Sequence, residues 1–228
     1  MNDRGSVFKQ LMESASRIPG GKDRSRKLSE SFDRITDRLV SKDSAEAAYQ
    51  DMIEEAEGVV EDVAFSEEAD LVDIRSLKML HKELQLAGSL SREENYEIPM
   101  FIQSELTSVN VKIIRGSKQK GTTVITMETE IYGKVAARFT VDKERITGLV
   151  VGEEPQFLDK MKEKDVSLRS MLNTADQTVR KMNYAIGRDI DLNQFEENIE
   201  RSGEEGVTTE SLYRISKTFL MFVKDLEQ

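Results

Sequence analysis

His81 is the only histidine in this 228-residue chain, which contains no cysteine. A Ser-His-Asp triad needs a positioned histidine, and a zinc site usually draws on several His or Cys ligands. His81 stands beside Leu80 and Leu84 in a run with helical spacing, which is typical of a structural or surface histidine. The missing cysteines exclude disulfides, thiolate metal sites and cysteine nucleophiles.

Adjacent carboxylates recur along the chain, but neighbours on a helix diverge by about 100° and do not converge on one substrate atom. Catalytic carboxylate pairs usually come from separate elements that face a cleft. We therefore interpret these pairs as solvated helix faces, and we expect no catalysis and no cofactor. The pairs are Glu54-Glu55, Glu67-Glu68, Glu93-Glu94, Glu153-Glu154 and Glu196-Glu197.

Gly116 and Gly121 have the spacing of a phosphate-binding loop, but Thr122 stands where that motif has a lysine. The motif works through a helix N-terminus and a lysine on the phosphates. The segments on either side are strand-like here, so the sequence predicts a polar hairpin loop.

A second motif has side-chain oxygens at positions 1, 3, 5 and 12 of a calcium loop: Asp189, Asp191, Asn193 and Glu200. Position 6, which must turn sharply and is normally glycine, is Gln194. Leu192, Phe195 and Ile199 instead follow helical spacing. We expect a capped short helix at this place and no metal.

The net charge of −10 should repel nucleic acid and anionic lipid. Two basic clusters, within residues 22–27 and 115–120, lack the aromatic side chains on which single-strand binders stack bases. No stretch approaches the ~18 apolar residues of a membrane span, and the N-terminus lacks an apolar signal core. We expect a cytoplasmic protein that binds no nucleic acid and does not insert into membranes, unless a signal-independent export route carries it out.

Residues 1–70 are expected to form a helical arm. Leu28, Phe32, Ile35 and Leu39 are spaced four, three and four residues apart, which gives a narrow amphipathic stripe. A second stripe runs through residues 49–63. Such stripes bury apolar area only against another element, so the arm is either an extended hairpin, a helix that needs a partner, or a marginal helix that frays in isolation.

Residues 71–228 are expected to form an α+β domain, in which an antiparallel β-meander is covered by helices. Apolar and polar residues alternate around Val135, Ala137 and Phe139, as in strands with one buried face. The expected elements are a helix at 71–88, strands at about 97–151, a helix at 155–172, a strand at 178–186 and a C-terminal helix at 208–227. The expected core includes Ile98, Val111, Val135, Phe139, Val150, Phe157, Leu168 and Phe219.

From about Asp73 onward the chain resembles a domain of bacterial flagellar hook-length control proteins. The stretches that carry this resemblance are Asp73-Ile74-Arg75-Ser76-Leu77, Leu84-Gln85-Leu86-Ala87, Tyr96-Glu97-Ile98-Pro99 and Ser108-Val109-Asn110-Val111. Residues 132–139 are similar to the Leu-Gly-x-Val-x-Val core motif of the hook-length control C-terminal domain. The resemblance covers roughly two-thirds of the chain. It departs from the family pattern at Tyr132, which replaces the leucine, and in the missing proline before it.

The resemblance implies a protein that is itself exported through the flagellar type III apparatus, with no cofactor and no catalysis. Its C-terminal domain would contact an export-gate component that switches substrate class from hook to filament subunits. The protein-binding residues would be Tyr132, Gly133, Lys134, Val135 and Arg138. Family members usually carry a long flexible ruler, whereas about 90 residues with helical patterns precede the sheet here. The chain is then a shortened relative or one that does not measure length.

The sequence thus predicts a non-catalytic protein-binding module that acts in flagellar export substrate switching. The alternative is a cytoplasmic adaptor or assembly protein that oligomerises through its N-terminal helices. Both functions use protein surfaces, so composition does not separate them.

Overall fold

The computed structural model describes residues 8, 11–12, 21–64, 71–102, 105–116, 120–129, 131–187 and 208–226. In the described part of the chain, the helices that precede the sheet are α2 (Gly21–Arg38), α3 (Lys42–Ala64) and α4 (Leu71–Ser91). Five consecutive strands follow: β1 (Asn95–Ile102), β2 (Glu105–Arg115), β3 (Lys120–Thr129), β4 (Gly133–Asp142) and β5 (Arg145–Gly152). The chain continues with α5 (Pro155–Glu163), α6 (Asp165–Leu172), β6 (Thr178–Ile186) and α7 (Thr208–Asp225).

The strands form one six-stranded sheet in the order β1-β2-β3-β4-β5-β6. Strands β1 to β5 pair antiparallel as a meander, which confirms the α+β class. The sheet is mixed, however, because β6 pairs parallel to β5, with Arg145 opposite Thr178. Helices α5 and α6 return the chain to the start of β5 before β6 begins, and a parallel neighbour requires such a crossover.

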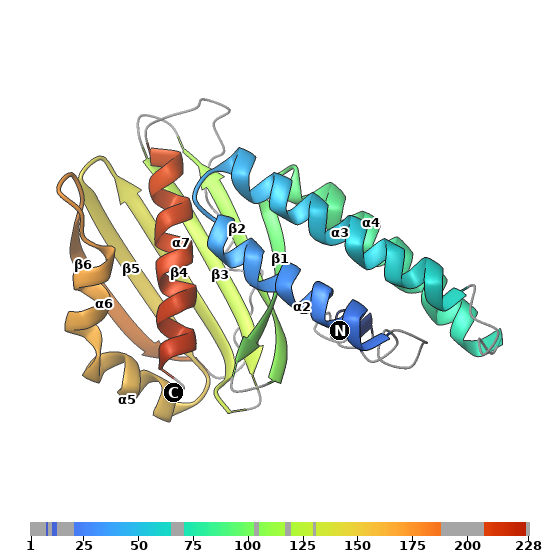
Figure 1. Cartoon of the computed structure of the whole chain (residues 1–228). Helices are drawn as coiled ribbons and strands as arrows, with labels where there is room; N and C mark the ends of the chain where they lie inside the picture. The colour runs from blue at the N-terminus through green and yellow to red at the C-terminus, as the bar shows by residue number, and fades with distance from the viewer. Residues whose placement is uncertain are drawn as a thin grey trace.

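Helix α7 lies across one face of the sheet and packs on β2, β3 and β4 (Figure 1). The rings of Phe139 and Phe219 meet edge to face with centroids 5.2 Å apart. The hydroxyls of Thr123 and Ser216 form a buried hydrogen bond of 2.7 Å below the helix. All eight core residues expected from the sequence are buried, which confirms that part of the prediction.

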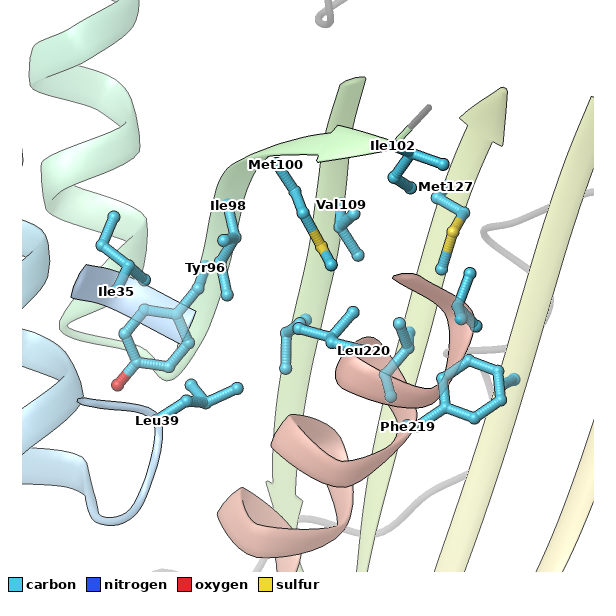
Figure 2. Packing of buried hydrophobic residues seen from close by; sticks show 14 of the residues in the cluster. Ile35, Leu39, Tyr96, Ile98, Met100, Ile102, Val109, Met127, Phe219 and Leu220 are labelled. Carbon is cyan, nitrogen blue, oxygen red and sulfur yellow. The ribbon is translucent and has the colours of Figure 1, made fainter. Parts of the chain in front are cut away.

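Helices α2 and α3 belong to the same hydrophobic core as the sheet. Leu28, Phe32, Ile35 and Leu39 are each at most 1% exposed, and Figure 2 shows Ile35 and Leu39 beside Tyr96 of β1. The amphipathic stripe is therefore covered within the chain, and the core crosses the expected boundary at residue 70 without interruption.

Polar contacts also join these helices to the sheet layer. The Tyr49 hydroxyl of α3 donates to the Glu97 carbonyl of β1 at 3.0 Å. Lys217 Nζ of α7 donates to the Asp37 carbonyl of α2 at 2.7 Å.

The expected helix over 155–172 is divided into α5 and α6 at Lys164. This residue has φ −97° and ψ 13°, so the regular helix stops there and restarts at Asp165. The restart places Asp165 where it accepts a 2.5 Å hydrogen bond from the Tyr184 hydroxyl of β6 and a 2.6 Å bond from Arg169 Nε. The break thus fixes α6 over the last strand.

Candidate protein-binding surface

The residues expected to bind a protein partner do not form one surface. Tyr132 is 1% exposed, its ring packs on Phe157, and its hydroxyl accepts a 2.9 Å hydrogen bond from Lys160 Nζ. Val135 is also buried, in the core under the helices. These two side chains stabilise the fold and offer no contact area in this conformation.

Gly133 forms the turn that opens β4. Its φ is +59°, and a Cβ there would lie 2.6 Å from a carboxylate oxygen of Glu153. The same carboxylate accepts the Lys134 backbone N–H at 3.0 Å, while Glu153 N–H donates to the Lys134 carbonyl at 2.9 Å. This position needs glycine for its positive φ, which is a structural requirement.

Lys134 and Arg138 lie on the opposite face of the sheet from Val135, because side chains alternate along a strand. Arg138 stands between Val124 of β3 and Leu149 of β5 in the strand register. Burial lowers the pKa of Arg138 from its ordinary value. This face carries a small cluster made only of strand residues: Ala136, Leu149 and Val151. The binding role of the five residues stays a prediction.

The other residues considered in the sequence analysis are His81, the two glycines of the phosphate-loop-like motif, and the calcium-loop-like stretch. His81 lies on α4, where its Nε2 is 2.9 Å from Gln85 Nε2 and its Nδ1 is 3.8 Å from Glu57. Gly116 and Gly121 flank the connection between β2 and β3, where Gly116 N–H donates to the Lys120 carbonyl at 2.8 Å. The expected calcium-loop stretch, residues 189–200, lies outside the described residues.

Within the described ranges, no three His, Cys, Asp or Glu side chains gather closely enough to hold a metal ion. Among the helices of the described chain, none combines the length and apolar character that a membrane crossing needs.

A buried polar network joins the helical layer to the sheet. Arg115 at the end of β2 donates two hydrogen bonds to the Glu94 carboxylate, at 2.7 and 2.8 Å. Tyr213 of α7 donates to the same carboxylate at 2.9 Å, and its oxygen is 2.9 Å from the Tyr96 hydroxyl. Since Tyr213 uses its hydrogen on Glu94, Tyr96 is the donor to Tyr213.

This network holds neutral phenols. Burial raises the pKa of Tyr96 to about 12, and the pKa of Tyr213 is raised as well, first by burial and then by Tyr96 and Glu94. Phenols that stay protonated in this way donate hydrogen bonds and do not act as bases at neutral pH. Glu94 itself has φ 59°, a conformation that is uncommon outside glycine and is held here by Arg115 and Tyr213. The network stabilises the turn between α4 and β1.

Strand β6 forms one of the two edges of the described sheet. Strand β6 is the last in the order, so no described strand pairs with its outer side. Gly187 N–H donates to the Gly152 carbonyl at 3.0 Å, which sets which residues bond to β5. In a parallel ladder successive residues point their N–H and C=O groups to opposite sides. The backbone N–H and C=O groups of residues 181, 183 and 185 therefore bond to β5. Those of Met182, Tyr184 and Ile186 point away from β5, toward the outer edge of the sheet.

The side chains around this edge are largely accessible. Arg180, Lys181, Asn183 and Ala185 are exposed, and Ile186 is 57% exposed. Helix α6 lies beside β6 (Figure 1). It carries Val166, which is 79% exposed. Strand β1, at the other end of the sheet, contains Pro99 and is contacted by α2 and α4. A nine-residue edge free of proline is therefore found only at β6 among the described strands.

Comparisons of this chain with protein-family models, curated proteins and solved structures give no match. The resemblance to hook-length control proteins accordingly rests on the sequence motifs quoted above. The β6 edge did not emerge from sequence reasoning, because local pattern gives a strand without its neighbours. Its signal was the adjacent pair Arg180 and Lys181, since charges on a strand are typical of an edge.

Proposed function

We propose that this chain is a non-catalytic protein-binding module that takes up an extended segment of a partner protein along the outer edge of β6. The observation that carries this proposal is the register of β6. It directs the N–H and C=O groups of Met182, Tyr184 and Ile186 away from the sheet, with no described strand beside them. An extended segment that pairs with these groups becomes a seventh strand, which is a common mode of peptide recognition.

The edge is long enough to give such a segment specificity. Outward groups repeat every two residues, or about 6.7 Å along a strand, so the stretch from Met182 to Ile186 offers three pairing positions. Side chains of the bound segment would alternate between the α6 side and the opposite face. On the α6 side they would meet exposed apolar atoms of Val166. Backbone pairing supplies affinity in this mode, and side-chain contacts supply selectivity.

The alternative is an assembly protein that oligomerises through its N-terminal helices. It was suggested by an apolar stripe that must pack against another element. Leu28, Phe32 and Ile35 of this stripe are buried within the chain, so the stripe does not require a second copy. In the flagellar form of the proposal, the partner is an export-gate component. This form is supported by the resemblance of residues 132–139 to the hook-length motif. Its test is deletion of the gene in the host, where normal hooks, filaments and swimming would remove it.

The backbone mechanism is tested by two substitutions at one residue. A library of random ten-residue peptides is selected for binding to the full chain, and selected peptides are measured against Ile186→Pro and Ile186→Ala. Proline removes the outward N–H, whereas alanine keeps it and removes most of the side chain. The register directs this N–H away from β5. We therefore expect both variants to fold, since proline is tolerated at such edge positions.

The expected result is binding that falls at least tenfold in Ile186→Pro and much less in Ile186→Ala. Circular dichroism and urea midpoints of the variants serve as the folding control. If no peptide is selected, or if Ile186→Pro binds the selected peptides as tightly as the natural chain, pairing along β6 is excluded.

A further inference from the structure

The segment from the turn before β5 to the end of β6 differs in net charge from the rest of the chain. Residues 143–186 contain eight Lys or Arg and seven Asp or Glu, a net charge of +1, in a chain of net charge −10. On β6 itself both charged residues are cations, Arg180 and Lys181, and both are exposed. The one carboxylate of α6, that of Asp165, is engaged by Tyr184 and Arg169. Among the described residues, Arg180 and Lys181 form no ion pair, so the edge presents positive charge.

The two ends of the edge also differ in polarity. The cations stand near the start of the strand, at positions 180 and 181, and the 57% exposed Ile186 stands at its end. Ala185 is exposed beside it. A segment paired along the edge would meet positive charge at one end and apolar side chains at the other.

Positive charge at the edge also disfavours pairing with a second copy of the chain. In parallel register, or in an antiparallel pairing centred on Arg180 and Lys181, two β6 strands would bring four cations together, and like charges on neighbouring strands are destabilising. Lysine on an exposed edge is a common device against self-association. The same charges attract an acidic segment, so they favour an acidic partner over a second copy of this chain.

From this charge pattern we infer that the occupant of the β6 edge is an acidic extended segment of a partner protein, with Asp or Glu residues against Arg180 and Lys181 and a β-branched apolar residue against Ile186. This inference rests on the proposed function and adds the chemistry of the partner. Surface ion pairs are individually weak, typically up to ~1 kcal/mol. Their expected effect is thus a moderate gain in affinity with a clear dependence on salt.

The test uses three synthetic ten-residue peptides of identical composition. One has Glu residues at its N-terminal end and Val and Ile at its C-terminal end, and the second has the reverse order, to allow either strand direction. The third has the same residues scrambled. Binding is measured by fluorescence anisotropy to the natural chain, to R180E/K181E, and to the matched control K78E/K82E. The control makes the same charge change at exposed positions of α4.

We expect a grouped peptide to bind the natural chain at least tenfold more tightly than the scrambled one. Binding should fall at least tenfold in R180E/K181E, change less than threefold in K78E/K82E, and weaken from 50 to 300 mM salt. Equal loss in both double variants, or no loss in either, would overturn the inference. If peptides without acidic residues bind and are sensitive to Ile186→Pro, the proposed function holds and only the partner chemistry is wrong. If Ile186→Pro weakens the binding of no peptide, both the proposed function and the inferred partner chemistry are wrong.

Discussion

The buried phenol of Tyr96 makes the stability of this fold depend on pH in the alkaline range. Burial raises the pKa of Tyr96 from 10.0 to about 12. A group with a raised folded-state pKa contributes stability that is fully present below pH 10 and is lost as pH rises through 12. Two pKa units correspond to ~2.7 kcal/mol, since each unit is worth ~1.4 kcal/mol. Tyr49 and Tyr213 are shifted in the same direction and add to the loss.

The substitution Tyr96→Phe separates this effect from general alkaline unfolding. At pH 7 it removes the 2.9 Å hydrogen bond to Tyr213, which should cost ~1 kcal/mol. Above pH 10 the natural chain loses the stability that depends on a protonated Tyr96, whereas the variant has no phenol at this position. The difference in the free energy of unfolding between the two should therefore shrink and then reverse toward pH 12. The measurement is urea unfolding followed by far-UV circular dichroism from pH 7 to 11.5. Phe139→Leu, which changes no titrating group, is the control. A Tyr96→Phe deficit that stays constant across this range would refute the reasoning.

Four further outcomes follow from the packing and the backbone conformation. Phe139→Ala should cost ~3–5 kcal/mol in urea unfolding, because the ring is fully buried against α7; an unchanged midpoint would contradict its place in the core. Phe32→Ala should cost a similar amount and leave a single unfolding transition for helices and sheet, whereas a separate early transition would mean that the N-terminal helices fold independently. Gly133→Ala should destabilise by ~1–2 kcal/mol, because its φ is +59° and the new Cβ would crowd Glu153. Gly58→Ala, in the middle of α3 with open space around it, should stabilise by ~0.5–1 kcal/mol, and equal effects of the two glycine substitutions would count against both assignments.

Local pattern was sufficient to place most of the elements. Alternation around Val135, Ala137 and Phe139 predicts a strand with one buried face, and the structure has β4 with these three side chains in the core. The spacing of Leu28, Phe32 and the residues that follow predicts the helix α2. Both inferences depend only on whether the apolar period is two or 3.6 residues.

Pairing between distant segments was not available from local pattern. The stripe on α2 shows that a cover is needed, but β1 and α7, which contact that helix, are far away in sequence. The parallel placement of β6 depends on how α5 and α6 carry the chain across the sheet. The edge of β6, and with it the candidate binding surface, follows from that crossover. Residues 132–138 were singled out by motif, and Tyr132 and Val135 proved to be buried.

Amide hydrogen exchange along β6 tests the central claim most directly. In the free chain, the outward amides of Met182, Tyr184 and Ile186 should exchange faster than the inward amides of Asn183 and Ala185. Saturation with a peptide selected on the full chain should slow the outward amides at least tenfold and leave the inward ones nearly unchanged. Binding with no protection of the three outward amides would contradict the account, because the partner would then lie on some other surface of the molecule.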